Sequence, residues 1–151
     1  MVSDRGSLRT ANVDDIDALV RLWELLFDEG DEAWKGHARE WFARYVDNAD
    51  TAWFPVIDVD GRLVAAAIGT LELTVPTPHC LRGRAVRLSN VITLPEYRGR
   101  GYGTQVVQDV ERWARSIGAD RVDLSATPDG RRLYEQVGFT LTSAPRMKLM
   151  L

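Results

Sequence analysis

The segment best suited to chemistry is a glycine-rich stretch, Leu94-Pro95-Glu96-Tyr97-Arg98-Gly99-Arg100-Gly101-Tyr102-Gly103-Thr104. Its glycines stand at alternate positions, so no Cβ atom keeps a ligand from the backbone, and consecutive N–H groups can point into one concave space. A helical pattern follows, and the unpaired N–H groups and dipole of a helix's first turn favour an anion. Arg98 and Arg100 add positive charge. The stretch therefore predicts a site for a phosphate-bearing ligand.

Other interpretations of these glycines are weaker. A dinucleotide-binding fold would need glycine or alanine where Thr104 stands and a preceding strand near the chain's start, although Asp120 and Asp123 lie near the spacing of a ribose-binding acid. A P-loop would need a Gly-Lys-Ser/Thr sequence, which does not follow. The remaining alternative is a turn that merely ends a strand. Alternating glycines flanked by two arginines favour the anion site over such a turn.

A second pattern spans residues 130–139 and reads Gly-Arg-Arg-Leu-Tyr-Glu-Gln-Val-Gly-Phe. Together with Arg98-x-x-Gly101-x-Gly103, and in the right order, it resembles the two signatures of the GNAT superfamily of acyl-CoA-dependent N-acetyltransferases. The resemblance implies that the loop holds the pyrophosphate of acetyl-CoA, while the pantetheine arm runs between two parallel strands that splay apart. The cofactor-binding residues it implies are Val91, Ile92, Thr93, Arg98, Gly99, Arg100, Gly101, Tyr102, Gly103 and Thr104.

The resemblance also implies one catalytic residue. Tyr134 matches the tyrosine that usually lies by the thioester sulfur, and a phenol with a pKa near 10 is protonated at neutral pH, so it could protonate the departing thiolate. The alternative is a packed tyrosine without a chemical role. Thr127 stands where the family often has asparagine, and the strand before the loop carries no carboxylate. The amine must lose a proton before it attacks. Glu72 or Asp123 could remove this proton through water, or the amine could be captured neutral from solvent.

The function implied is transfer of acetyl from acetyl-CoA to a primary amine of a small molecule or peptide, by direct attack in a ternary complex. The alternative is a non-catalytic acyl-CoA-binding module that senses or regulates, and the missing strand carboxylate keeps it open. No signature specifies the acceptor, whose site the first two helices and the Pro-rich loop would form. With one cysteine and two histidines in the chain, we expect no metal site.

Composition narrows the class of protein. A chain of 151 residues with 45% apolar content predicts one domain, residues 1–151. The net charge of −3 argues against a nucleic-acid partner. The polar N-terminus does not resemble a secretory signal, and no apolar run reaches the length of a bilayer span, so we expect a cytoplasmic protein without a membrane partner. The sequence leaves the oligomeric state open, a homodimer included.

Hydrophobic periodicity predicts the elements that position the loop. In chain order they are a strand over 7–11, a helix capped by Asn12 and ended by Gly30, a helix over 34–48, strands over 53–59 and 62–74 joined by Asp60-Gly61, a strand over 85–93, a helix from 102 to Gly118, a strand over 121–126, a short helix begun by Thr127-Pro128 and ended by Gly138, and one or two strands over 139–151.

The connection through the helix after the loop makes strands 85–93 and 121–126 parallel neighbours. The order of elements predicts an α/β protein with a GNAT-like fold, in which helices cover both faces of a central, mostly antiparallel sheet with one parallel, splayed strand pair. Before the loop strand lies a basic cluster of Arg82, Arg84 and Arg87. We favour a solvated rim over an anion site for this cluster.

Overall fold

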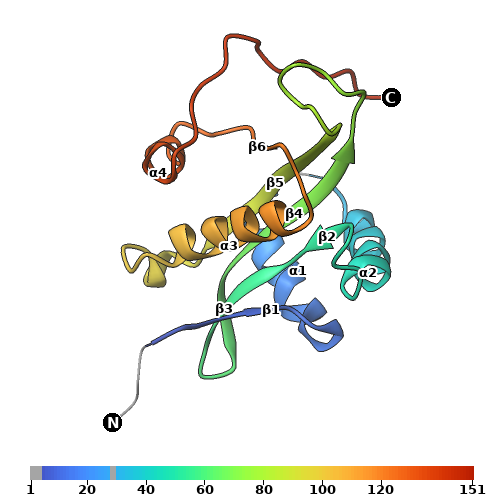
Figure 1. Cartoon of the computed structure of the whole chain (residues 1–151). Helices are drawn as coiled ribbons and strands as arrows, with labels where there is room; N and C mark the ends of the chain where they lie inside the picture. Colours follow the sequence, from blue (N-terminus) through green and yellow to red (C-terminus); the bar gives the residue numbers. More distant parts are fainter. Residues whose placement is uncertain (1–4, 28–29) are drawn as a thin grey trace.

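The molecule is built on a six-stranded sheet, seen in a computed structural model that describes residues 5–27 and 30–151 (Figure 1). The strand order is β1 (Ser7–Thr10), β3 (Pro55–Val59), β4 (Arg62–Leu73), β5 (Arg84–Thr93) and β6 (Arg121–Asp123), and β2 (Ala52–Trp53) pairs with β4 beyond the end of β3. Strands β5 and β6 are parallel, and the other pairs are antiparallel. The predicted mixed sheet is confirmed.

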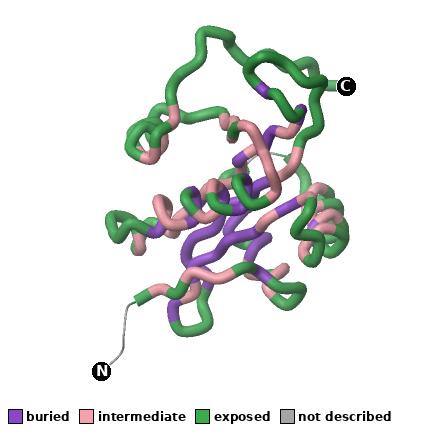
Figure 2. Tube along the Cα trace, viewed as in Figure 1, coloured by how far each residue is buried: buried purple, intermediate pink, exposed green. Residues whose placement is uncertain are grey.

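Helices cover both faces of this sheet. On one face, α1 (Ile16–Glu24) and α2 (Ala33–Tyr45) enclose a core that includes Trp23, Phe42 and Phe54. On the other, α3 (Tyr102–Ser116), with α4 (Arg131–Val137) packed at its edge, encloses a core of aliphatic side chains from β3, β4 and β5. Figure 2 shows the buried residues gathered in the central strands and on the inner side of α3. The predicted arrangement of helices on both faces is therefore correct.

Helix α3 packs directly on β4 through its C-terminal half. A Cβ atom on Gly69 would lie 2.8 Å from Val110 Cγ1 and 3.0 Å from Trp113 Cζ3, so glycine is what permits the approach. The Trp113 indole stacks on Trp53 at a centroid distance of 6.2 Å and donates its N–H to the Ala49 carbonyl. These contacts make α3 a rigid support for the loop that precedes it.

Local signals predicted several boundaries correctly. Asp60 and Gly61 have φ angles of 51° and 86°, as the tight turn between antiparallel β3 and β4 requires. The Asn12 side chain accepts the Asp14 N–H and forms a capping box with Asp15, ahead of a 3₁₀ turn over Val13–Asp15 that leads into α1. Gly118 follows α3 with a φ of 74°, which confirms it as the residue that ends this helix.

Other boundaries were wrong. Helix α1 ends at Glu24 rather than at Gly30, although residues 28–29 of the predicted helix lie outside the described residues. Strand β6 ends at Asp123 rather than at 126, and α4 begins at Arg131, because the Thr127 carbonyl accepts N–H groups of residues 130 and 131 in a separate turn. Phe54 separates β2 from β3 inside the predicted strand 53–59.

The predicted strands over 139–151 do not form. Residues 140–151 are all exposed, including the apolar Leu141, Met147 and Leu149 (Figure 2). The alternating pattern of this tail is typical of a strand, but a strand also needs a partner edge, and within the described residues the tail pairs with none. Also within these residues, no helix has the length and apolar character needed to span a bilayer.

Candidate active site

Strand β5 separates from β6 before the glycine-rich loop begins. The parallel pairing covers Ala85–Arg87 opposite Arg121–Asp123, after which β5 continues to Thr93 beside β4 alone. The pairing of β5 with β4 is itself irregular, because the register shifts between Ala66 and Ile68 and Asn90 has a φ of 51°, which is rare for a non-glycine residue. The end of β5 thus presents backbone on its β6 side, as the predicted splayed pair requires.

The loop after β5 turns sharply into α3. A short 3₁₀ turn over Pro95–Tyr97 follows Thr93, whose carbonyl accepts a hydrogen bond from Arg98 Nε (3.3 Å). Gly101 caps α3 with φ 82° and ψ 8°, and the first helical acceptor bond runs from the Gln105 N–H to the Gly101 carbonyl. The preceding N–H groups have no acceptor inside the helix. The start of this 15-residue helix therefore has the free N–H groups that the predicted anion site needs.

The three loop glycines are needed for two different reasons. Gly99 and Gly101 have φ angles of 79° and 82°, and a Cβ atom on either would meet nothing within 4 Å, so the backbone angle alone requires glycine. Gly103 has no such angle, but its Cβ atom would lie 3.0 Å from Leu133 Cδ1 on α4. Gly103 therefore lets α4 approach the start of α3.

These elements surround a cavity of about 690 Å³, here called the glycine-loop cavity. Its lining contains nine of the ten predicted cofactor-binding residues together with Tyr134: Val91, Ile92, Thr93, Arg98, Gly99, Gly101, Tyr102, Gly103 and Thr104. The volume suits a small molecule or cofactor. Residues from β5, the loop and α4, far apart in the sequence, thus meet at one place.

Arg100 and Tyr102 are placed differently from the other predicted residues. Arg100 does not line the cavity, and its guanidinium lies over the Tyr97 ring, 4.9 Å from the centroid. The Tyr102 side chain is 6% exposed and packs into the core, where its hydroxyl accepts the Gly6 N–H (2.9 Å). We therefore expect Tyr102 to face a ligand through its backbone, and Arg100 to add charge only from outside the cavity.

Tyr134 is held at the cavity wall by the end of its own helix. Gly138, with a φ of 119°, and Phe139 donate N–H groups to the carbonyls of Glu135 and Tyr134, which is a Schellman motif. This motif turns Phe139 back onto Tyr134, and their rings meet edge to face at 5.9 Å. The sequence Tyr-Glu-Gln-Val-Gly-Phe therefore fixes the tyrosine ring.

The Tyr134 hydroxyl is suited to donating a proton. Partial burial raises its pKa above the ordinary value, so the phenol stays protonated across the neutral range. Within the described part of the chain, no group is hydrogen bonded to it. A ligand in the glycine-loop cavity would meet a neutral O–H donor.

Neither carboxylate that the sequence offered as a base lines this cavity. Glu72 pairs with Ala85 near the opposite end of β5, and Asp123 pairs with Arg87, six residues before Thr93. The one carboxylate among the described lining residues is Asp129, in the turn before α4. Thr127 also lines the cavity.

Sequence reasoning missed six of the lining residues: Leu26, Tyr97, Asp129, Gly130, Leu133 and Gln136. Gly130, Leu133 and Gln136 lie inside the second signature, and helical spacing could have found Gly130, which lies four residues before Tyr134. Asp129 directly precedes that signature. Leu26, which follows α1, carries no local signal, because only the folding of the chain brings it to the loop.

Comparison with known proteins places the chain in a family. The sequence profile of the acetyltransferase (GNAT) family matches residues 16–139, which include both signatures and the whole glycine-loop cavity. The chain belongs to the GNAT family. The resemblance noted in the two signatures is thereby confirmed.

Individual relatives are more distant. The chain is 38% identical over 56 residues to the uncharacterized N-acetyltransferase YobR of Bacillus subtilis (strain 168), covering 35% of this chain and 23% of that protein. It is 32% identical over 73 residues to the glucosamine 6-phosphate N-acetyltransferase of Trypanosoma brucei brucei, covering 48% of this chain and 50% of that protein. The chain thus spans half or less of the length of these curated relatives.

Solved structures support the fold over nearly the whole chain. A predicted acetyltransferase from Clostridium acetobutylicum, solved with acetyl-CoA, matches with a TM-score of 0.85 at 23% identity, covering 96% of each chain. At this identity the match concerns the fold. It includes the mixed sheet with its parallel pair.

Proposed function

We propose that this chain is an N-acetyltransferase that moves acetyl from acetyl-CoA to a primary amine of a small molecule or peptide, by direct attack in a ternary complex. The observation that carries the proposal is the glycine-loop cavity. One of its walls is the N-terminal end of α3, preceded by two left-handed glycines, and another is Tyr134, whose ring is held in place by Phe139.

The cavity suits the two ends of acetyl-CoA. The N–H groups at the start of α3 would hold the pyrophosphate, and Arg98, tied back to the Thr93 carbonyl, would add charge beside it. The backbone of Val91, Ile92 and Thr93, which has no β6 partner, would hydrogen bond the extended pantetheine arm. This orientation directs the thioester toward Tyr134.

In the proposed reaction the amine nitrogen attacks the acetyl carbonyl carbon, and the C–S bond breaks as the C–N bond forms. Tyr134 gives its hydroxyl proton to the leaving sulfur and is reprotonated from solvent. The amine enters neutral, and the proton it loses after attack passes to water; Asp129 is the one carboxylate among the described lining residues that could take it up. The products are an amide and CoA.

The second candidate is a non-catalytic acyl-CoA-binding module. The observation that favours it is that the residues of β5 nearest the cavity, from Ser89 to Thr93, include no carboxylate that could serve as a base. Such a module would bind acetyl-CoA in the same cavity. The two candidates therefore differ in turnover rather than in binding.

Free-thiol release from acetyl-CoA separates them. The protein is incubated with acetyl-CoA and single amines, including glucosamine, glucosamine 6-phosphate, aminoglycosides, polyamines, amino acids and peptides, and mass spectrometry identifies the product. We expect thiol release that depends on an amine and equals the amount of amide formed. Stabilisation by CoA without an acetylated product from any amine would favour the non-catalytic module.

A further inference from the structure

Two arginine side chains converge on a single neutral hydroxyl at the end of β6. Arg87 Nη2 on β5 and Arg146 Nη1 in the C-terminal tail both donate to Ser125 Oγ, at 2.9 Å and 2.8 Å. A serine oxygen has two lone pairs, and both are now used, so its own hydrogen is left to point outward as a third donor. The arginine–serine cluster, meaning Arg87, Ser125 and Arg146, therefore offers donors and no acceptor.

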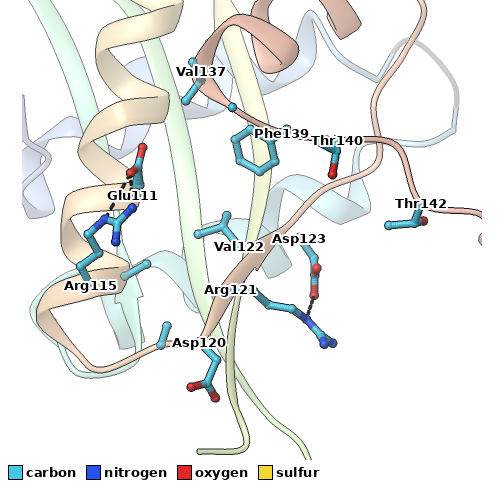
Figure 3. A pocket seen from close by; sticks show the side chains of 13 residues that line it. Glu111, Arg115, Asp120, Arg121, Val122, Asp123, Val137, Phe139, Thr140 and Thr142 are labelled. Atoms are coloured by element: carbon cyan, nitrogen blue, oxygen red, sulfur yellow. Dashed lines mark hydrogen bonds and ion pairs between the residues drawn. The ribbon is translucent and has the colours of Figure 1, made fainter. Parts of the chain in front are cut away.

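The arginines of this cluster form no ion pair within the described part of the chain. No carboxylate there forms an ion pair with Arg87 or Arg146, whereas the neighbouring acids already have partners. Asp123 accepts from Arg121 Nε at 3.0 Å, and Figure 3 shows this pair pointing away from α3, next to the cavity between α3, β6 and the tail. Glu135 likewise pairs with Arg131 on α4. Within the described residues, neither Arg87 nor Arg146 is therefore part of an ion pair, although Asp123 is the cross-strand neighbour of Arg87.

The other members of the basic cluster seen in the sequence have structural roles. Arg82 Nη1 donates to the Gly118 carbonyl (3.3 Å), and Arg84 Nε donates to the Ile117 carbonyl (3.1 Å). Both arginines thus bond carbonyls that directly follow α3, at the end of the helix where its dipole favours a positive charge. Arg87 has no such role, so the anion-site interpretation of the basic cluster is left to Arg87 alone.

The position of the cluster connects it to the reaction. Ser125 and Arg146 line a cavity of about 300 Å³, and Tyr134 lines both this cavity and the glycine-loop cavity. Val86 packs in the core beneath α3, so its neighbour Arg87 projects from the opposite face of the sheet. A molecule bound between the cluster and Tyr134 could therefore reach a thioester held in the glycine-loop cavity.

We propose that the acceptor amine carries a phosphate monoester, which the arginine–serine cluster binds. A phosphate monoester at neutral pH has a charge between about −1.5 and −2, which matches two guanidinium groups, and its three oxygens can accept from two arginines and a hydroxyl. This inference rests on the proposed acetyl transfer, because it places the amine of the same molecule beside Tyr134. The cluster sets specificity, and the glycine loop binds the cofactor.

Inorganic phosphate tests the binding step without turnover. Phosphate is titrated calorimetrically into protein saturated with CoA, so that the glycine loop is filled. We expect binding that is weakened roughly tenfold or more in Arg87→Gln and in Arg146→Gln, partly restored in the lysine variants, and unchanged in Arg132→Gln, an exposed α4 arginine that lines neither cavity. Equal affinity in the parent and both glutamine variants would overturn the proposal. It would also be overturned if these variants only lowered the melting temperature, as expected when the arginines merely hold the tail in place.

Matched acceptors test the specificity step. We expect kcat/KM for glucosamine 6-phosphate to exceed that for glucosamine by tenfold or more, and this ratio to collapse in Arg146→Gln but to keep the parent's value in Arg132→Gln. A parent enzyme that acetylates both amines equally would overturn the inference and leave the proposed function standing. If CoA does not bind at all, the proposed function fails, yet phosphate titration of the CoA-free variants still tests the cluster.

Discussion

Replacing Gly101 with alanine tests whether backbone angle, rather than space, makes the loop. At Gly101 the φ angle is 82°, and an added Cβ atom would meet nothing within 4 Å. The whole cost is therefore conformational, about 1–2 kcal/mol for a non-glycine residue in the left-handed region. In a chain of this size, that lowers the melting temperature by about 2–8 °C.

Gly36 provides a matched control for this prediction. It lies in α2, where the same substitution also meets nothing within 4 Å, but its backbone has no left-handed angle. Gly36→Ala should raise the free energy of unfolding by up to about 1 kcal/mol, because alanine is the better helix former. One chemical change should thus have opposite effects at two equally open positions.

Thermal melts with and without CoA give the result. Gly101→Ala should melt below the parent and bind CoA roughly tenfold or more weakly, since a relaxed angle turns the first N–H groups of α3 away from the anion. Gly36→Ala should bind CoA like the parent. If Gly101→Ala melted like the parent and kept its CoA affinity, the angle would be irrelevant and the reasoning about the loop refuted.

Three further predictions concern single side chains. Tyr134→Phe should lower kcat about 100-fold, near the lower end of general acid catalysis, while CoA affinity stays unchanged, and Tyr45→Phe on α2 is the control. Because burial raises the pKa of Tyr134, ionisation of this tyrosine should not lower kcat below pH 10. An unchanged rate in Tyr134→Phe, with chemistry rate-limiting, would assign the tyrosine to packing. Asp15→Asn should lower the free energy of unfolding by about 1–2 kcal/mol at pH 7, because it removes the Arg9 ion pair and the capping box. The Arg9 hydrogen bond lowers the Asp15 pKa, so this stability is lost as pH falls through that lowered pKa. Chemical denaturation should therefore show a smaller difference between parent and variant at pH 2 than at pH 7. Gly69→Ala should cost about 1–3 kcal/mol in chemical denaturation, because its Cβ atom would press on Val110 and Trp113 of α3; a neutral effect would show that the helix can move away freely.

Features with a local cause could be predicted from the sequence. Asp60-Gly61 and Asn12 act through their own backbone and neighbours, so the hairpin and the first cap were correct. The order of elements followed from periodicity, and the parallel pairing of β5 and β6 from the helix between them. The loop from Arg98 to Thr104 combines such local signals, and its predicted residues lie together around one cavity apart from Arg100.

Features that depend on distant contacts could not be predicted in the same way. The tail has the alternation of a strand, but pattern alone does not say whether an open sheet edge lies within reach. The inward direction of Tyr102 depends on Gly6 at the other end of the chain. The meeting of Arg87 with Arg146 at Ser125 joins three segments that show no relation in sequence, so the anion site that we propose there could not be inferred from the sequence alone.

The most direct test of CoA binding in the glycine-loop cavity is the melting temperature of the parent protein with CoA, acetyl-CoA and NAD. A ligand at 100 times its dissociation constant adds about 2.7 kcal/mol to the free energy of unfolding, which corresponds to roughly 5–10 °C in a chain of this size. We expect CoA and acetyl-CoA to produce this shift and NAD to produce none. A melting temperature unmoved by millimolar CoA would contradict the assignment of the glycine-loop cavity.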